Sequence, residues 1–531
     1  MSSLRRVLHM TGAVAAALCL SAPSQAVPQN TAPAASHAVP TPATPATPPQ
    51  ATAPAQAASP PAAEHSALLQ SADALVREVA ALRGLPPKTT IARGVLSREQ
   101  IVDKQRARIA KQLTPEDIRH EAGVLKRLGL LPSDMNYEKT VFDLFADQVA
   151  GFYDPPTRTL YIADWLPVPL QRPALAHEIQ HALQDQYFDL QKFVGPLKEE
   201  GDASLARSAV VEGDGIAVML ELPAKGTRPD VARSPTVMAR LGKQMMYLTM
   251  GATPSFQKAP AALRETMIFP YASGLEFVGT YRGDGGWARV NDLFRDPPES
   301  TEQVMHPDKY IAREHPVRIA SAPLSTLVGS GRKEVRRDVM GELMWKIWFS
   351  SAMAQSQAET AAEGWGGDRL VAYAGPSDDQ PLVLALTAWD SDLDADEAEL
   401  ASRRVLADLV TPPLPSKDAA RKDAPKPSPI TAAKDSKPSS PSGIHKPARS
   451  GPFWTYKGDA AYGLVRRDRQ IALFLGIPKG SEAAISEEIF RAFRVTWPSP
   501  AGTPPELLAP ASATTPAGGS APPSRPPGPW R

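Results

Sequence analysis

One third of the way along the chain, five consecutive residues have the types and the spacing of a metal site: His177, Glu178, Ile179, Gln180 and His181. On a helix, residues i and i+4 stand on one face with Cβ atoms about 6 Å apart, so two imidazoles so placed can bind one zinc ion through bonds of about 2 Å. The glutamate beside the first histidine lies about 100° around the helix, where it can act as general base on a metal-bound water. The motif predicts one Zn²⁺ per chain, with Glu178 as the catalytic base.

A catalytic zinc usually takes three protein ligands and keeps a fourth position for water. No further histidine follows at the His-x-x-Gly-x-x-His spacing. Glu212 is the predicted third ligand, because it lies in an apolar helical stretch where a carboxylate is costly to bury unless it is paired or binds a metal. Asp214 is either a rival ligand or, as the preferred role, the acceptor of an imidazole N–H behind the metal. The alternative is that both acids only flank a helix kink at Gly213 and Gly215.

Further polar side chains are candidates for the same site. Asp185, one helical turn after His181, either orients a histidine or is an ordinary exposed acid. A group that stabilises the oxyanion would be a Tyr, His or Arg near the metal. The candidates for this role are Tyr271, His306 and Tyr310. For each of these, the alternative is a buried side chain that only satisfies its own hydrogen bonds.

The elements that must position these residues are indicated by local patterns. Pro173 lies near the start of a predicted helix over 171–190, where proline is tolerated, and good helix formers follow it. A second predicted helix, 202–222, carries the third ligand. Residues 149–163 place aromatic and β-branched residues on both sides of the turn sequence Asp154–Thr157, which predicts a β-hairpin. A strand pair beside the motif helix could bind an extended peptide by β-addition.

Apolar periodicity predicts a mainly helical body followed by a small α+β unit. Outside the site, helices are predicted at 68–79, 101–113, 115–128, 140–148, 234–250, 270–282 and 286–294. In the α+β unit, strands are predicted at 382–389, 462–465 and 471–475, and helices at 395–409 and 481–493. The glycine-rich segments 283–286 and 364–367 are interpreted as turns, since neither has the Lys-Ser/Thr ending of a phosphate loop.

Composition separates folded from extended parts of the chain. The 56 prolines among 531 residues gather largely in three tracts, which have too little apolar surface to fold. These tracts are predicted to be disordered tethers at 27–63, 411–452 and 498–531. The predicted fold class is α+β, with a helical catalytic domain at 64–380 that has a small β-sheet edge, and a small C-terminal unit made of 381–410 and 453–497.

Residues 1–26 have the pattern of a cleaved signal peptide. A pair of arginines precedes the short apolar run 12–20, and Ser24–Ala26 offers a small-residue cleavage site. The run is short for a membrane span, although an uncleaved anchor is the alternative. Cleavage would remove Cys19, the only cysteine, and leave metal binding to His and carboxylate ligands. The protein is therefore expected to be exported, to the periplasm or beyond the cell, with no stable membrane span afterwards.

Charge excludes one large class of partners. Lys and Arg number 58 and Asp and Glu 57, which gives a formal net charge of +1. Such a balance provides no electrostatic footprint for DNA, RNA or anionic lipid, so nucleic acid is not an expected partner. The expected partner is a peptide or protein substrate, and nothing in the sequence indicates the oligomeric state.

With these motifs the chain resembles the gluzincin-type zinc metallopeptidases, in which a downstream glutamate completes the His-Glu-x-x-His site. It is more similar to a group of uncharacterised bacterial exported proteins classed as metallopeptidases. The matching segments are HEIQHALQDQYFDL (177–190), VVEGDG (210–215), FPYASGLEFV (269–278), GGWARVNDLFRDPPESTEQVMHPDKY (285–310) and GWGGDR (364–369). The resemblance implies a zincin-like fold over roughly 115–410 and zinc-dependent peptide hydrolysis. The chain departs from better-studied gluzincins in its longer spacing to Glu212 and in lacking their Asn-Glu-x-x-Ser-Asp phrase.

The sequence therefore favours an exported zinc-dependent hydrolase that cleaves peptide bonds. A non-catalytic, zinc-stabilised binding protein of the cell envelope is the main alternative, because a tether and a C-terminal unit suit it equally well. A metal-free scaffold is the third possibility.

Overall fold

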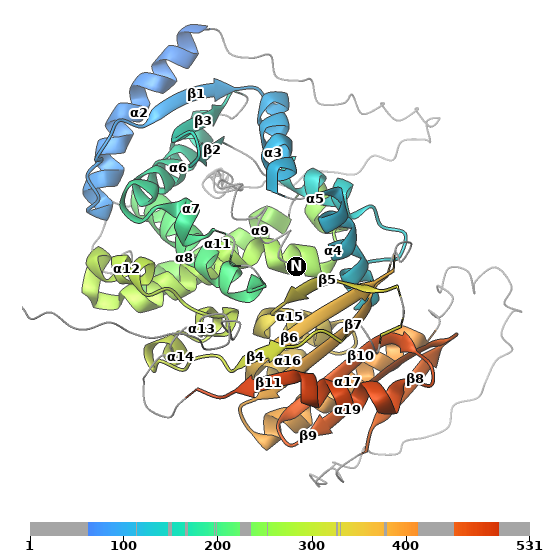
Figure 1. Cartoon of the computed structure of the whole chain (residues 1–531). Helices are drawn as coiled ribbons and strands as arrows, with labels where there is room; N and C mark the ends of the chain where they lie inside the picture. The colour runs from blue at the N-terminus through green and yellow to red at the C-terminus, as the bar shows by residue number, and fades with distance from the viewer. Residues whose placement is uncertain are drawn as a thin grey trace, which may run out of the picture.

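A computed structural model describes residues 62–112, 114–146, 151–164, 168–195, 197, 199–223, 235–251, 253–324, 328–329, 331–375, 380–411 and 451–498. The predicted signal peptide 1–26 and nearly all of the predicted tethers 27–63, 411–452 and 498–531 lie outside the described residues. Figure 1 shows a small sheet with its helices at one end, a larger sheet at the other, and a helical region between them.

The small sheet has three strands, β1 (Ala92–Leu96), β2 (Gly151–Asp154) and β3 (Thr159–Ala163). Their order is β1-β3-β2, with β1 parallel and β2 antiparallel to β3, so β2 is an outer strand. The predicted hairpin is present as β2 and β3, within the described part of 149–163. The parallel partner β1 was not predicted, because its short sequence contains an arginine and a glycine and lacks the apolar alternation of a strand.

Helices cover both faces of this sheet. Tyr153, Leu160 and Ile162 face α2 (Ala62–Arg83) and α6 (Val168–Phe188), and they form one apolar cluster with residues of these helices. Phe152 and Ala163 face the opposite way and pack against α3 (Arg98–Gln112). The alternation of side chains along β2 and β3 therefore holds the motif helix α6 on one face and α3 on the other.

The helical region is built around α8 (Gly201–Glu221) and α11 (Ala261–Arg282), which are in backbone contact. A Cβ added at Gly213 would lie 2.2 Å from the carbonyl oxygen of Gly274, and one added at Gly274 would lie 2.2 Å from that of Ala209. Only glycine allows this approach. Helix α8 runs without interruption through Gly213 and Gly215.

Shorter helices complete this region, and one of them begins with a capping box. The side chain of Thr114 accepts a hydrogen bond from the Asp117 backbone and Pro115 occupies the first turn of α4. These helices are α4 (Pro115–Arg127), α5 (Tyr137–Ala146), α7 (Leu190–Phe193), α9 (Pro235–Gly251), α10 (Pro254–Lys258), α12 (Gly286–Arg295), α13 (Thr301–Met305), α14 (Pro307–Ile311), α15 (Gly341–Ser350) and α16 (Gln355–Glu363).

The C-terminal sheet has six antiparallel strands in the order β5-β6-β7-β10-β9-β8. They are β5 (Lys333–Asp338), β6 (Trp365–Ala374), β7 (Leu382–Trp389), β8 (Phe453–Lys457), β9 (Ala460–Arg467) and β10 (Gln470–Pro478). Helix α17 (Asp392–Val410) packs on one face. Helix α19 (Glu482–Ala492) and the strand pair β4 (Arg318–Ser321) and β11 (Phe493–Thr496) pack on the other.

This sheet joins the two predicted halves of the C-terminal unit, since β7 pairs with β10. The sheet also includes β5 and β6, which precede residue 381 in the sequence. The predicted domain boundary at 380 therefore falls inside one sheet. The interpretation of 364–367 as a turn was wrong, since β6 starts at Trp365. Gly367 allows the backbone of Val317 to approach β6 closely, because a Cβ added at this position would lie 2.2 Å from the Val317 carbonyl oxygen.

The described residues therefore form a mixed fold of helices and largely antiparallel sheets, which is consistent with the predicted α+β class. Among their helices, none combines the length and the apolar character that crossing a membrane requires.

Candidate metal centre

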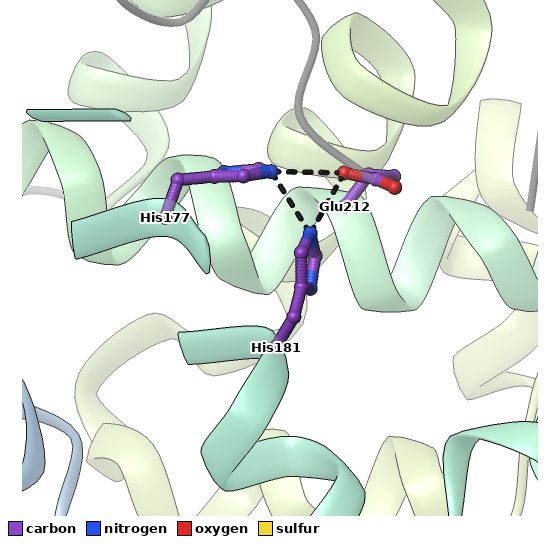
Figure 2. Close-up of side chains that lie close together, drawn as sticks. All are labelled: His177, His181 and Glu212. Atoms are coloured by element: carbon purple, nitrogen blue, oxygen red, sulfur yellow. Dashed lines mark hydrogen bonds and ion pairs between the residues drawn. The ribbon is translucent and has the colours of Figure 1, made fainter. Parts of the chain in front are cut away.

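Helices α6 and α8 bring three ligand atoms to one point (Figure 2). The Nε2 atoms of His177 and His181 are 2.9 Å apart. The Oε2 atom of Glu212 lies 3.1 Å from the first and 3.3 Å from the second. All three side chains are buried, with 0%, 3% and 4% of the residue exposed respectively. The two histidines and the glutamate predicted from the sequence are thus brought together.

The arrangement of these atoms fits a zinc ion. A tetrahedral zinc with bonds of about 2.0–2.1 Å holds its ligand atoms about 3.3 Å apart. The circle through the three atoms has a radius of about 1.8 Å, which is less than the bond length, so a point at bonding distance from all three exists. Two imidazoles and a carboxylate are also a donor set that zinc accepts in catalytic sites.

A second group of acids in the described residues does not compete as a metal site. Glu302, Glu314 and Asp390 have ligand atoms close together. The Nζ atom of Lys309 lies 2.6, 2.8 and 2.9 Å from their carboxylates. The ammonium group therefore already supplies the cation that these three acids require.

Gly215 sets the distance between α8 and the two imidazoles. A Cβ at this position would lie 2.8 Å from Cε1 and 2.9 Å from Nδ1 of His177, and 3.3 Å from Cε1 of His181. Carbon atoms in ordinary contact are about 3.5–4.0 Å apart. The absence of a side chain at Gly215 therefore allows α8 to carry Glu212 up to the histidines.

Gln184, on the turn after His181, fixes the orientation of that imidazole. Its Nε2 donates to Asp214 Oδ2 at 2.8 Å and to the Val211 carbonyl at 3.1 Å, and both of these oxygens only accept. Its Oε1 therefore faces Nδ1 of His181, at 2.8 Å, and that nitrogen carries the proton. The lone pair of His181 Nε2 is then directed to the point shared with His177 and Glu212.

Asp214 contacts the imidazole of His181 only through the side-chain amide of Gln184. Its Oδ2 accepts from Gln180 at 2.9 Å and from Gln184, and its Oδ1 accepts from Nε of Arg83 at 2.8 Å. The prediction that Asp214 accepts an imidazole N–H directly was wrong, because the Gln184 amide lies between them, and the rival role as ligand has no geometric support. Arg83 is buried at the end of α2, 131 residues from Asp214, so no local pattern could have indicated it.

Glu178 lies beside the three ligands without joining them. Its Oε2 accepts from the backbone N–H of Tyr153 in β2 at 2.6 Å. Its Oε1 has no hydrogen-bond partner in the described part of the chain and lies 4.0 Å from Nε2 of His177. Burial raises the pKa of Glu178 to about 8; His181 opposes this shift and the charge of Glu212 adds to it. A carboxyl group in this state can exchange a proton near neutral pH.

The protonation of the ligands follows from their mutual distances. Burial lowers the pKa of His177, and the neighbouring His181 lowers it further. Burial also lowers the pKa of His181, but the Glu212 carboxylate outweighs burial and raises the value to about 9. The pKa of Glu212 falls to about 2, because the two imidazoles outweigh the opposite effect of burial. Without metal, the site therefore holds an ion pair between His181 and Glu212, and binding a cation would release one proton.

Of the three candidates for oxyanion stabilisation, only Tyr271 lies at this site. It is buried in α11, its ring centroid is 6.5 Å from that of His177, and its hydroxyl has no hydrogen-bond partner among the described residues. Burial raises the pKa of Tyr271, and the charges of Glu212 and Glu178 raise it further.

The other candidates are bound elsewhere, which corrects their predicted roles. Nε2 of His306 pairs with Glu342 at 2.9 Å, and the Tyr310 hydroxyl donates to the carbonyl of Asp296 at 2.6 Å. Asp185 accepts from the Tyr153 hydroxyl at 2.8 Å and from a backbone N–H at the start of α7, so it orients no histidine. It instead holds the side chain of the residue whose N–H binds Glu178.

Comparison with known proteins leaves this site unassigned. A family model described as a domain of unknown function (DUF8575) matches residues 326–429, which include β5, β6, β7 and α17. No curated protein and no solved structure matches the chain. The matched segment lies outside α6 and α8, so what the site does has to be inferred from its own chemistry.

Proposed function

We propose that the protein is an exported zinc-dependent hydrolase that cleaves peptide bonds. The observation that carries the proposal is the convergence of His177, His181 and Glu212 on one point, beside an oxygen of Glu178 that has no hydrogen-bond partner among the described residues. Export rests on the signal-peptide pattern at the start of the sequence.

Zn²⁺ held by these three residues would polarise the scissile carbonyl and acidify the attacking water. Glu178 then takes the proton of that water on Oε1 and passes it to the leaving amine. The Tyr153 N–H holds the other oxygen of Glu178, which keeps Oε1 directed to the site. The Tyr271 hydroxyl donates to the oxyanion, a role that its lack of any other partner in the described chain supports.

The position of β2 supports a peptide as substrate. This strand is an outer strand of the described sheet and lies against α6, and the backbone N–H of Tyr153 donates to Glu178. An extended peptide added along this edge would place its carbonyl groups beside the metal point. A sheet with an outer strand next to the motif helix also favours the zincin-like arrangement that the sequence resemblance implies.

Glu178→Gln on the purified protein tests the proposal. We expect one zinc per chain by elemental analysis in both proteins, and a hydrolysis rate about 10²–10⁴-fold lower in the variant, measured on a peptide mixture by mass spectrometry. Glu138→Gln, at an exposed position in α5, is the matched control and should keep full activity. Zinc-loaded Glu178→Gln that hydrolyses peptides as fast as the wild type would refute the mechanism.

A non-catalytic protein stabilised by zinc is a second candidate, favoured by the burial of all three ligands. In a structural site the metal supplies folding free energy, so chelation should unfold the protein. In a catalytic site chelation should abolish hydrolysis and leave most of the secondary structure. Circular dichroism and peptide hydrolysis, followed together during chelation, distinguish the two functions.

A further inference from the structure

One face of α3 directs polar side chains toward β2, the strand whose Tyr153 N–H binds Glu178. Ile101, Gln105 and Arg108 share this face, because they are four and three residues apart. Ile101 packs on Phe152 of β2. Nη1 of Arg108 lies 3.6 Å from Oδ1 of Asp154 at the end of the same strand. The face therefore runs along β2.

The two polar residues on this face have side-chain atoms without a hydrogen-bond partner among the described residues. Gln105 is 4% exposed, and within the described residues neither its Nε2 nor its Oε1 has a partner. The side chain of Arg108 is 14% exposed, and its Nε and Nη1 have no hydrogen-bond partner there either. Burial lowers the pKa of Arg108 to about 10, since Asp154 offsets the loss of water only in part.

Packing alone does not account for this pair. A buried polar group without a partner costs about 1–3 kcal/mol, and a charged group costs more. Such groups are few in native proteins, and two on adjacent turns of one helix indicate a place where a ligand completes the bonds. The Lys309 cluster shows the contrast, because three carboxylates surround that partly buried cation.

The pair is close to the proposed reaction site. Tyr153 stands between Phe152 and Asp154 in β2, and its N–H binds Glu178 at 2.6 Å. The side chains of its two neighbours point to the face of α3, since successive side chains alternate along a strand. Gln105 and Arg108 therefore lie on the α3 side of β2, and the base Glu178 lies on the α6 side. A peptide bound along β2 could reach both sides within a few of its residues.

We propose that Gln105 and Arg108 form a subsite for a carboxylate of the substrate, which deepens the proposed peptidase function and rests on it. The guanidinium group supplies charge-assisted hydrogen bonds to the carboxylate. The amide of Gln105 can donate to the same group and accept from a neighbouring peptide N–H. The carboxylate comes from an acidic side chain or from the C-terminus of the peptide.

Peptide binding to the full chain tests the subsite. The protein is zinc-loaded Glu178→Gln, which prevents turnover, and the probes are fluorescent peptides that differ only in Glu against Gln, or in a free against an amidated C-terminus. A charge-assisted hydrogen bond is worth about 1.5–3 kcal/mol, so we expect the carboxylate forms to bind at least about tenfold more tightly by anisotropy. The pair of peptides that shows the difference identifies the source of the carboxylate.

In the Glu178→Gln background, Arg108→Gln should remove the preference for the carboxylate peptides. The control Arg106→Gln removes a charge from an exposed position of α3 and should keep this preference. Thermal unfolding supplies a readout that a structural arginine would change. We expect Arg108→Gln to leave the melting temperature almost unchanged, because Nε and Nη1 have no hydrogen-bond partner in the described chain and the loss of the 3.6 Å ion pair with Asp154 is offset by the removal of a largely buried charge. If that variant does not fold, the melting-temperature expectation fails, and Gln105→Met, with an expected partial loss of preference, tests the subsite.

The outcomes separate this inference from the proposed function. Peptide hydrolysis by the wild type without a carboxylate preference, or a preference that survives Arg108→Gln, overturns the subsite and leaves the hydrolase. Absence of zinc and of hydrolysis overturns the hydrolase. In that case an Arg108-dependent preference in binding still supports a carboxylate site, and a failure to bind either form of the peptides overturns it.

Discussion

Replacing Gly215 with alanine tests whether the contact of α8 with the imidazoles sets metal affinity. The new Cβ would lie 2.8 Å from Cε1 of His177 and 3.3 Å from Cε1 of His181, against about 3.5–4.0 Å for ordinary contact. Overpacking of this kind costs about 1–3 kcal/mol. If both imidazoles must stay in place to hold the ion, zinc affinity should fall by about 5–150-fold.

The same substitution should affect the metal-free protein much less. Without the ion, no bond to zinc fixes the two imidazoles, so small rotations of these side chains can relieve the contact with the new methyl group. Alanine is also the better helix former, by about 1 kcal/mol relative to glycine in a helix interior. We therefore expect the melting temperature of metal-free Gly215→Ala to stay close to that of the wild type.

Gly213→Ala, two residues earlier in α8, is the matched control. Its Cβ would lie 2.2 Å from the oxygen and 2.3 Å from the carbonyl carbon of Gly274, which are backbone atoms that no side-chain rotation can move. This variant should lose stability with or without metal. Zinc affinity is measured by competition with a chromophoric chelator, and stability by calorimetry after chelation. Wild-type zinc affinity in Gly215→Ala would refute the proposed role of the glycine.

Other substitutions and pH test the groups around the ligands. Tyr271→Phe should lower kcat about 10²–10³-fold with zinc content unchanged, and should not lower the melting temperature, because its hydroxyl has no partner in the described chain; kinetics and calorimetry check both. Asp214→Asn should weaken zinc binding about 10–100-fold in the chelator assay, because it disturbs the Gln184 amide that orients His181. The pKa of His181 is raised from 6.5 to about 9 in the folded, metal-free protein, so its stabilising contribution is complete below pH 6.5 and is lost as the pH rises through about 9. The melting temperature of the metal-free protein should fall over that pH range while zinc affinity rises. In His181→Gln the melting temperature should depend less on pH.

Local sequence patterns were sufficient for the centre of the site. The motif helix and the hairpin before it were predicted because periodicity and turn residues depend on neighbours within a few positions. Glu212 was predicted for a different reason, namely that a carboxylate in an apolar helix needs a partner. That argument depends on burial alone, so it holds without knowledge of which elements meet.

Only the tertiary structure decided which distant groups meet at the site. It selected Tyr271 over His306 and Tyr310, and it placed Arg83 behind Asp214, because these contacts depend on how helices far apart in the sequence pack. It likewise showed β5 and β6 within the C-terminal sheet. The glycines of α8 are a further example, since the sequence offered no reason for their positions beyond a possible kink. In the fold, Gly213 allows the backbone of α11 to approach and Gly215 allows the imidazoles to approach, because the space beside a residue is set by the element that packs against it.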